Sequence, residues 1–260
     1  MQILLTNDDG IHAPGLRALE AELRRIGDVC VVAPATEQSG VGHSITFLRP
    51  LVAHEVFDGD RRRGWAVEGS PADSVKLGII EFSDRRPDLV VSGINGGLNA
   101  GINVLYSGTV AAAIEGAFFG ITSIAVSLEY DEHAMFEQAA RLARRLIETI
   151  VERNGPNPHL YNINIPTAAL DGPAEVHVVP MGVQAYGEEF EKRVDPRGRT
   201  YYWMIGKIDN PPHDPETDLS ALERGHITVT PLDFDLTRQS TLAKMRDWSW
   251  DLTDRIDVQP

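Results

Sequence analysis

Apolar runs alternate with amphipathic stretches over the first 180 residues of the chain. The runs lack helical spacing and therefore predict buried strands, which cover residues 3–5, 29–33, 87–92, 121–128, 160–165 and 176–180. Apolar spacing and capping residues predict helices at 14–26, 70–82, 109–119 and 133–153. Elements that alternate in this way build a doubly wound, mostly parallel α/β sheet with helices on both faces, an α/β/α sandwich. We expect one such domain over residues 1–260.

Between the second predicted strand and the helix at 70, the apolar runs are shorter and turn residues separate them. They predict strands at 45–48, 51–57 and 65–68, with an exposed hairpin tip at 58–63. The arginines of that tip are interpreted as a solvated turn rather than a binding patch.

The character of the chain changes again after residue 180. Residues 182–218 are rich in Gly, Pro, Tyr and charged residues, a composition that rarely forms a core by itself. We therefore expect a protruding C-terminal arm at 182–226 that packs against another subunit in an oligomer. A further strand is predicted at 227–231 and a terminal helix at 236–250.

The first strand ends in two adjacent carboxylates, Asp8 and Asp9, followed by Gly10. Such a pair repels and loses hydration at the end of a buried strand, so it needs a cation or hydrogen-bond donors. The two side chains serve one site only if the strand ends at about Asp8, where Gly10 permits a turn. Taken alone, the motif also fits an acidic turn that merely ends a strand.

Two further loops follow predicted strands, and they carry Ser39 and Asn95. Because the carboxyl ends of parallel strands meet at one edge of a sheet, we expect these residues to lie near Asp8 and Asp9. Carboxylate, hydroxyl and amide oxygens suit Mg²⁺ or Mn²⁺. The His and Cys spacing of a zinc site is absent from the sequence, because the histidines are scattered and there is one thiol.

The third loop leads into Ser107, Gly108 and Thr109 at a predicted helix start. Free backbone N–H groups, two hydroxyls and the positive end of the helix dipole suit a phosphate there. An ordinary Ser/Thr cap explains the same residues equally well. The segment has neither the Gly-Lys-Ser/Thr ending of a P-loop nor the Gly-x-Gly-x-x-Gly fingerprint.

Charge and composition narrow the choice of partners. The chain has 38 acidic and 24 basic residues, a formal charge of −14, which disfavours non-specific binding to nucleic acid or to anionic membranes. The only cysteine, Cys30, lies in an apolar run and is expected in the core. Without a basic leader or a convincing membrane span, the sequence predicts a cytoplasmic protein.

A series of short motifs runs along nearly the whole chain. They include Asn7-Asp-Asp-Gly10, Gln38-Ser-Gly40, Gly69-Ser-Pro-Ala-Asp73, Ser92-Gly-Ile-Asn95, Asn99-Ala-Gly101, Tyr106-Ser-Gly-Thr109, Asp195-Pro-Arg-Gly-Arg199, Thr217-Asp218 and Val229-Thr-Pro-Leu232. In these motifs and their order the chain resembles the SurE survival-protein nucleotidases. The resemblance implies a Rossmann-like fold and a homodimer or homotetramer joined by the C-terminal arm. It also implies a phosphatase that acts on nucleoside 5′- and 3′-monophosphates and, in some members, on short polyphosphate.

Position by position, the resemblance implies one divalent metal ion per subunit, Mg²⁺ or Mn²⁺, and the residues around it. The implied metal ligands are Asp8, Asp9, Ser39 and Asn95, and the implied phosphate contacts are Asn99, Ser107, Gly108 and Thr109. Two positions depart from the family pattern, because Asn103 stands where Asp is usual and Ser74 where Cys is frequent. The first changes the charge of a loop near the phosphate, which leaves substrate preference open.

Several mechanistic hypotheses follow from these residues. In metal-assisted hydrolysis, Asp8 is the general base and Asp9 mainly a ligand, although the roles can be exchanged. Alternatively, Asp8 is a nucleophile that forms an aspartyl-phosphate. Asn7 and His43 are candidates for supporting positions, and His43 is more typical of a hydrogen-bonding loop residue than of a general acid.

Two other protein classes compete with this hypothesis. One is a non-catalytic nucleotide-binding sensor on the same fold, which would need phosphate donors but no paired-carboxylate metal site. The other is a haloacid-dehalogenase-type phosphatase, whose Asp-x-Asp after the first strand is not supplied by the first nine residues.

Overall fold

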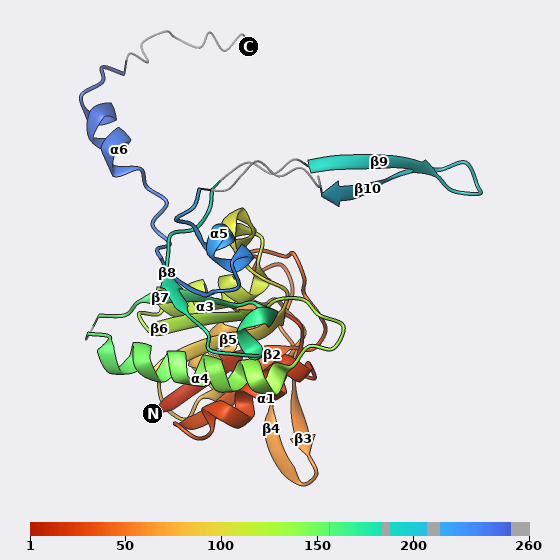
Figure 1. Cartoon of the computed structure of the whole chain (residues 1–260). Helices are drawn as coiled ribbons and strands as arrows, with labels where there is room; N and C mark the ends of the chain where they lie inside the picture. Colours follow the sequence, from red (N-terminus) through yellow and green to blue (C-terminus); the bar gives the residue numbers. More distant parts are fainter. Residues whose placement is uncertain (156, 184–187, 207–213, 251–260) are drawn as a thin grey trace, which may run out of the picture.

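A nine-stranded sheet forms the middle of the structure (Figure 1). The computed structural model describes residues 1–155, 157–183, 188–206 and 214–250. The strands of the sheet are β1 (Gln2–Thr6), β2 (Asp28–Pro34), β3 (Ala53–Asp58), β4 (Arg61–Val67), β5 (Leu89–Gly96), β6 (Thr122–Leu128), β7 (Leu160–Ile165), β8 (Val176–Val178) and β11 (Ile227–Leu232). Their spatial order is β3-β4-β2-β1-β5-β6-β7-β11-β8.

The chain reverses its direction of winding at β1. This strand pairs in parallel with β2 on one side and with β5 on the other. The chain therefore first builds outward through β2 and β4, and then returns to place β5 beside β1. Only β3 against β4, and β11 against β7, pair antiparallel within the described part of this sheet. The predicted doubly wound, mostly parallel sheet is thus confirmed, with its topological switch point between β1 and β5.

Helices cover both faces of the sheet. On one face lie α1 (Pro14–Leu23) and α4 (Phe136–Arg153), and on the other α2 (Pro71–Leu77) and α3 (Gly108–Phe118). The alternating side chains of β1 explain this arrangement, because Ile3 and Leu5 pack in the cluster of Leu19 and Ile147, whereas Leu4 packs with Val75. Because β1 is buried on both faces, polar and apolar residues do not alternate along it, as its sequence pattern indicated.

Shorter elements complete the chain. They are the π-helical turn η1 (Gly78–Phe82), which continues α2, the 3₁₀ turns η2 (Gly101–Leu105) and η3 (Thr167–Leu170), and the helices α5 (Asp218–Glu223) and α6 (Gln239–Arg246). None of the described helices is long and apolar enough to cross a membrane.

Three predictions for local structure differ from the structure. Residues 45–48 form no strand, because Thr46 N–H donates to the Asp73 carboxylate instead of a neighbouring strand, and Phe47 and Leu48 are exposed. The terminal helix predicted at 236–250 is limited to α6, none of whose residues is buried. Cys30 is half-buried against the cluster of Leu4 rather than fully buried.

A separate antiparallel ribbon is formed by β9 (Glu188–Val194) and β10 (Thr200–Gly206). Figure 1 draws it standing off the main sheet. It lies within the segment predicted as an arm, of which residues 184–187 and 207–213 lie outside the described residues. At the base of this segment the buried Asp218 carboxylate accepts hydrogen bonds from Gly101 N and Gly182 N, both at 2.8 Å.

The close approach of α1 to β5 gives a first prediction. A Cβ on Gly15 would lie 2.1 Å from the carbonyl oxygen of Ile94, a backbone atom that cannot move aside easily. We expect Gly15→Ala to lower the free energy of unfolding by about 1–3 kcal/mol, although Ala is the better helix former. Chemical denaturation measures the change. Gly172→Ala is the control, because a Cβ there meets open space, and equal stability of the two variants would contradict the packing argument.

Candidate active site

A cleft of about 300 Å³ opens at the carboxyl ends of β1, β2 and β5, beside the switch point. Most of its lining is polar and comes from the loops that follow these strands. The lining residues are Asp8, Asp9, Glu37, Ser39, Gly40, Asn95, Gly96, Leu98, Asn99, Asn103, Tyr106 and Ser107. All four predicted metal ligands are therefore brought to one cleft, together with two of the four predicted phosphate contacts.

The turn after β1 brings both carboxylates to this cleft. The strand ends at Thr6, before Asp8, as the sequence argument required. The buried Asn7 side chain closes the turn, because its Nδ2 donates to Gly10 O at 3.0 Å and its Oδ1 accepts from Gly10 N at 3.2 Å. Gly10 has φ of +99°, a conformation that favours glycine. Asn7 thus supports the site by shaping the turn.

Asp8 is held against the first turn of α3. Its Oδ1 accepts a hydrogen bond of 2.5 Å from the hydroxyl of Thr109, which is completely buried. Gly108 lets the helix approach, because a Cβ there would lie 2.8 Å from Asp8 Cβ and 3.2 Å from Pro71 Cγ. The partial positive charge of the helix N-terminus therefore faces the carboxylate. In the metal-free protein, Thr109 orients Asp8, a role that sequence reasoning did not assign to it.

The protein's own groups compensate the negative charge of the two aspartates poorly. Burial raises the pKa of Asp8, although hydrogen bonds from Thr109 act against this effect. Burial, followed by the nearby charge of Asp8, raises the pKa of Asp9 to about 6. Glu37 adds a third negative charge that raises the pKa values of both aspartates. A divalent cation would offset this cluster of acidic groups.

Ser39 and Asn95 complete the predicted set of oxygen ligands. The exposed Ser39 hydroxyl donates to Glu37 Oε1 at 2.6 Å, which leaves its oxygen lone pairs for a cation. The Asn95 amide nitrogen donates to Gly97 O at 2.6 Å, so its carbonyl oxygen is the available ligand atom. Gly96 N donates to Asp9 Oδ2 at 3.4 Å. This donor chemistry fits Mg²⁺ or Mn²⁺.

Glu37 is a cleft residue that sequence reasoning missed. Its position two residues before Ser39, in the loop after β2, was the available signal. Asn103 and Tyr106 also line the cleft, on the side where the third loop turns toward α3. The substitution noted at Asn103 therefore faces the site.

Two of the predicted phosphate contacts, Asn99 and Ser107, each keep one hydrogen-bond donor for a ligand. Asn99 is fixed in place, because its Nδ2 donates to Ser127 Oγ at 2.9 Å and its backbone N–H to Asn164 Oδ1 at 2.8 Å. One hydrogen of its amide group remains for a ligand. The Ser107 hydroxyl caps α3 by accepting from Val110 N at 3.1 Å, and its own hydrogen remains to be donated.

His43 does not line the cleft. Its Nε2 lies 2.8 Å from Glu115 Oε2, and Lys76 Nζ donates to the other oxygen of that carboxylate at 2.6 Å. Burial alone would raise the pKa of Glu115, but these two hydrogen bonds hold it below its ordinary value. The His43 ring also contacts Phe118. His43 therefore anchors the loop that carries Ser39 to α3.

The fold and the cleft define an α/β protein whose site suits a hard divalent cation beside a phosphate group. The chain belongs to the SurE family, since the family profile described as "Survival protein SurE" matches residues 3–188.

Full-length relatives agree with this assignment. A protein of Rhodopirellula baltica named "5'-nucleotidase SurE" is 58% identical over 96% of this chain and 99% of its own length. One of the same name from Heliobacterium modesticaldum is 46% identical over 95% of this chain and 92% of its own. The crystal structure of the SurE protein from Aquifex aeolicus superposes with a TM-score of 0.83 at 38% identity, covering 95% and 98% of the two chains.

Because the pKa of Asp9 is raised, removing the charge of this side chain should stabilise the protein, and the size of the effect should depend on pH. Because that pKa of about 6 lies above the ordinary 3.8, the metal-free fold loses stability as pH rises through this window. Asp9→Asn should therefore raise the free energy of unfolding at neutral pH by about 1–2 kcal/mol, allowing for solvent screening, and by little near pH 3.8.

Thermal unfolding with a chelator present measures this effect. Asp60→Asn, at the exposed β3–β4 turn, is the control with the same change of charge. A variant at position 9 that is less stable than the parent at neutral pH would contradict the argument.

Proposed function

We propose that this protein is a metal-dependent 5′-nucleotidase that hydrolyses nucleoside monophosphates to nucleoside and phosphate. The observation that carries the proposal is the convergence of Asp8, Asp9, Ser39 and Asn95 on one cleft at the switch point of the sheet. The relatives named 5′-nucleotidase match nearly the whole chain, which supports the same activity. A sensor would need the phosphate donors but not the paired carboxylates.

In this proposal, one Mg²⁺ or Mn²⁺ per subunit is held by the oxygens of Asp8, Asp9, Ser39 and Asn95. The bound ion supplies positive charge against the phosphoryl oxygens. Asn99 and Ser107 bind the phosphate through the donors that their structural hydrogen bonds leave unused. Gly108 and Thr109 belong to the same phosphate-binding end of α3, where Thr109 acts mainly by orienting Asp8.

Asp8 is the proposed acceptor of the proton from the attacking water, with Asp9 as a ligand. Thr109 fixes Asp8 Oδ1, so the carboxylate is held in one orientation. As the bond between the water oxygen and phosphorus forms, the ester bond to the nucleoside breaks, and the leaving nucleoside oxygen takes up a proton from solvent. Activity on 3′-monophosphates and on short polyphosphate belongs to the proposal too, because the resemblance to the SurE nucleotidases implies it. We also expect the protein to act in the cytoplasm, where the free thiol of Cys30 stays reduced.

Removing the central carboxylate tests this function. Asp8→Asn should lower kcat for adenosine 5′-monophosphate by at least about a hundredfold, because both a ligand and the proton acceptor are lost. Phosphate release in the presence of Mn²⁺ is the measurement, and chelation should abolish it reversibly in the parent protein.

Asp60→Asn is the control, with the same chemical change far from the cleft. Full activity of folded Asp8→Asn would refute the site, whereas tight nucleotide binding without phosphate release in the parent would favour the sensor.

We propose further that the β9–β10 ribbon joins subunits into a dimer or tetramer. Both of its faces expose apolar side chains. Phe190, Tyr202 and Met204 lie on one face, and Tyr201, Trp203 and Ile205 on the other. An isolated two-stranded ribbon is marginally stable in water, so a second copy that covers these side chains would stabilise it.

Replacing residues 188–206 with a short Gly/Ser linker should reduce the particle mass in light scattering to that of one chain. The control is the double substitution Phe47→Ser and Leu48→Ser, which removes exposed apolar side chains outside the ribbon. An unchanged mass after loss of the ribbon would show that subunits associate elsewhere.

A further inference from the structure

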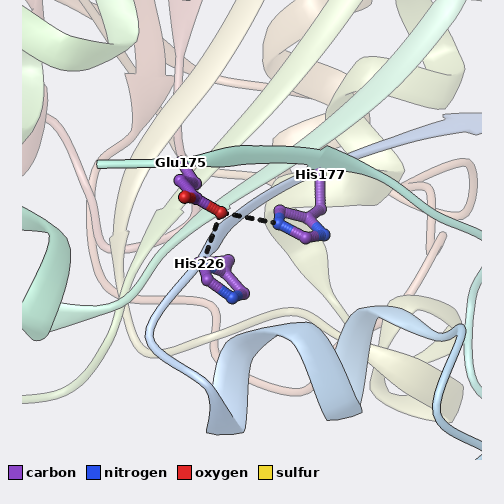
Figure 2. Close-up of side chains that lie close together, drawn as sticks. All are labelled: Glu175, His177 and His226. Carbon is purple, nitrogen blue, oxygen red and sulfur yellow. Dashed lines mark hydrogen bonds and ion pairs between the residues drawn. The ribbon is translucent and has the colours of Figure 1, made fainter. Parts of the chain in front are cut away.

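A second cluster of potential metal ligands lies at the β8 edge of the sheet. Glu175 directly precedes β8, His177 lies within β8, and His226 directly precedes β11. The parallel register of the two strands pairs Ile227 with Val176, and Ile227 N donates to Glu175 O at 2.9 Å. This pairing places Glu175 beside His226. Figure 2 shows the Glu175 carboxylate pointing between the two imidazole rings.

The donor atoms lie slightly farther apart than the ligands of a tetrahedral site. Glu175 Oε2 lies 3.4 Å from His177 Nε2 and 3.8 Å from His226 Nδ1, and one donor atom from each residue lies within 4.8 Å of the others. Bonds of about 2.0–2.1 Å to a tetrahedral zinc ion imply separations of roughly 3.3–3.4 Å between ligand atoms. Small side-chain movements would therefore close the cluster around an ion.

The local structure leaves room for those movements. The two rings stack with centroids 4.2 Å apart and an angle of 14° between planes, so they must tilt to direct both nitrogen lone pairs at one ion. The side chains of His177 and His226 are 35% and 23% exposed, which gives an ion access from solvent. Three protein ligands would leave a fourth position for water.

The chemistry of this cluster differs from that of the cleft. Two imidazoles and one carboxylate favour zinc and similar borderline ions, whereas the oxygen ligands of the cleft favour Mg²⁺ or Mn²⁺. Three strands, β6, β7 and β11, separate β8 from β5. At about 4.8 Å per strand, β8 lies roughly 19 Å from β5 across the sheet. Each can therefore bind its own ion.

We propose that Glu175, His177 and His226 form a second metal site, for a zinc-class divalent ion. A bound ion would link the residue before β8 to the start of β11. Strand β8 has only three residues and lies at the edge of the sheet, with Val176 46% and Val178 73% exposed. Metal binding should therefore stabilise this edge of the sheet.

Titration of the full chain with Zn²⁺ in excess Mg²⁺, which occupies the oxygen site, tests the proposal. We expect one saturable Zn²⁺ per chain and a rise in melting temperature. His177→Ala and His226→Ala should each weaken binding by more than about tenfold. Co²⁺ should give the visible absorption of a tetrahedral site in the parent and not in these variants.

His54→Ala is the matched control, because His54 forms a similar surface pair with Glu68 at 2.9 Å but has no third ligand in its described surroundings. It should bind Zn²⁺ like the parent. Glu175→Gln, which preserves side-chain volume, provides the test if a histidine variant fails to fold. Zn²⁺ binding that is absent in the parent, or unchanged in folded variants of the cluster, would overturn the proposal.

Discussion

The burial of the Asp8 carboxylate against the first turn of α3 is the constraint on which the site depends. A negative charge at the end of a buried strand is unfavourable unless donors surround it. Thr109 supplies a short hydrogen bond, and Gly108 allows the helix to come close enough for its N-terminus to face the charge. This contact joins β1 to α3 at the switch point. The position of the cleft therefore follows from where the sheet changes its direction of winding.

The loops around Asp8 are fixed by buried polar contacts rather than by apolar packing. Asn99 is held by the side chains of Ser127 and Asn164, which come from β6 and β7. His43 is held by Glu115 on α3. Loops fixed in this way keep polar atoms in defined places while their surfaces stay open to solvent. The negative charges of the cleft lining are thus gathered around one point, at Asp8, Asp9 and Glu37.

The sequence predicted the sheet and most of the cleft, because both depend on local signals. Apolar runs without helical period gave the parallel strands, and the turn at Gly10 followed from the need to aim two adjacent carboxylates at one site. Ser39 and Asn95 were found because each directly follows a strand. The failures at residues 45–48 have a different origin, since the partner of Thr46 is Asp73, far along the chain. No local pattern encodes that bond.

Contacts between residues far apart in the sequence were the main feature that could not be predicted. The orienting role of Thr109 depends on a partner 101 residues away. The histidines seemed scattered, yet the pairing of β8 with β11 brings His177 and His226 into ring contact. The sequence showed no zinc-like set of ligands because these residues lie far apart along the chain. Such sets become visible only when the register of non-consecutive strands is known.

The buried carboxylate of Asp218 gives the molecule a shared anchor. It fixes Gly101, in the middle of the loop bordering the cleft, and Gly182, where the chain leaves for the ribbon. Two segments with separate tasks are thereby fastened by the oxygens of one side chain. A change that displaces the Asp218 carboxylate would therefore disturb the loop at the cleft and the base of the ribbon together.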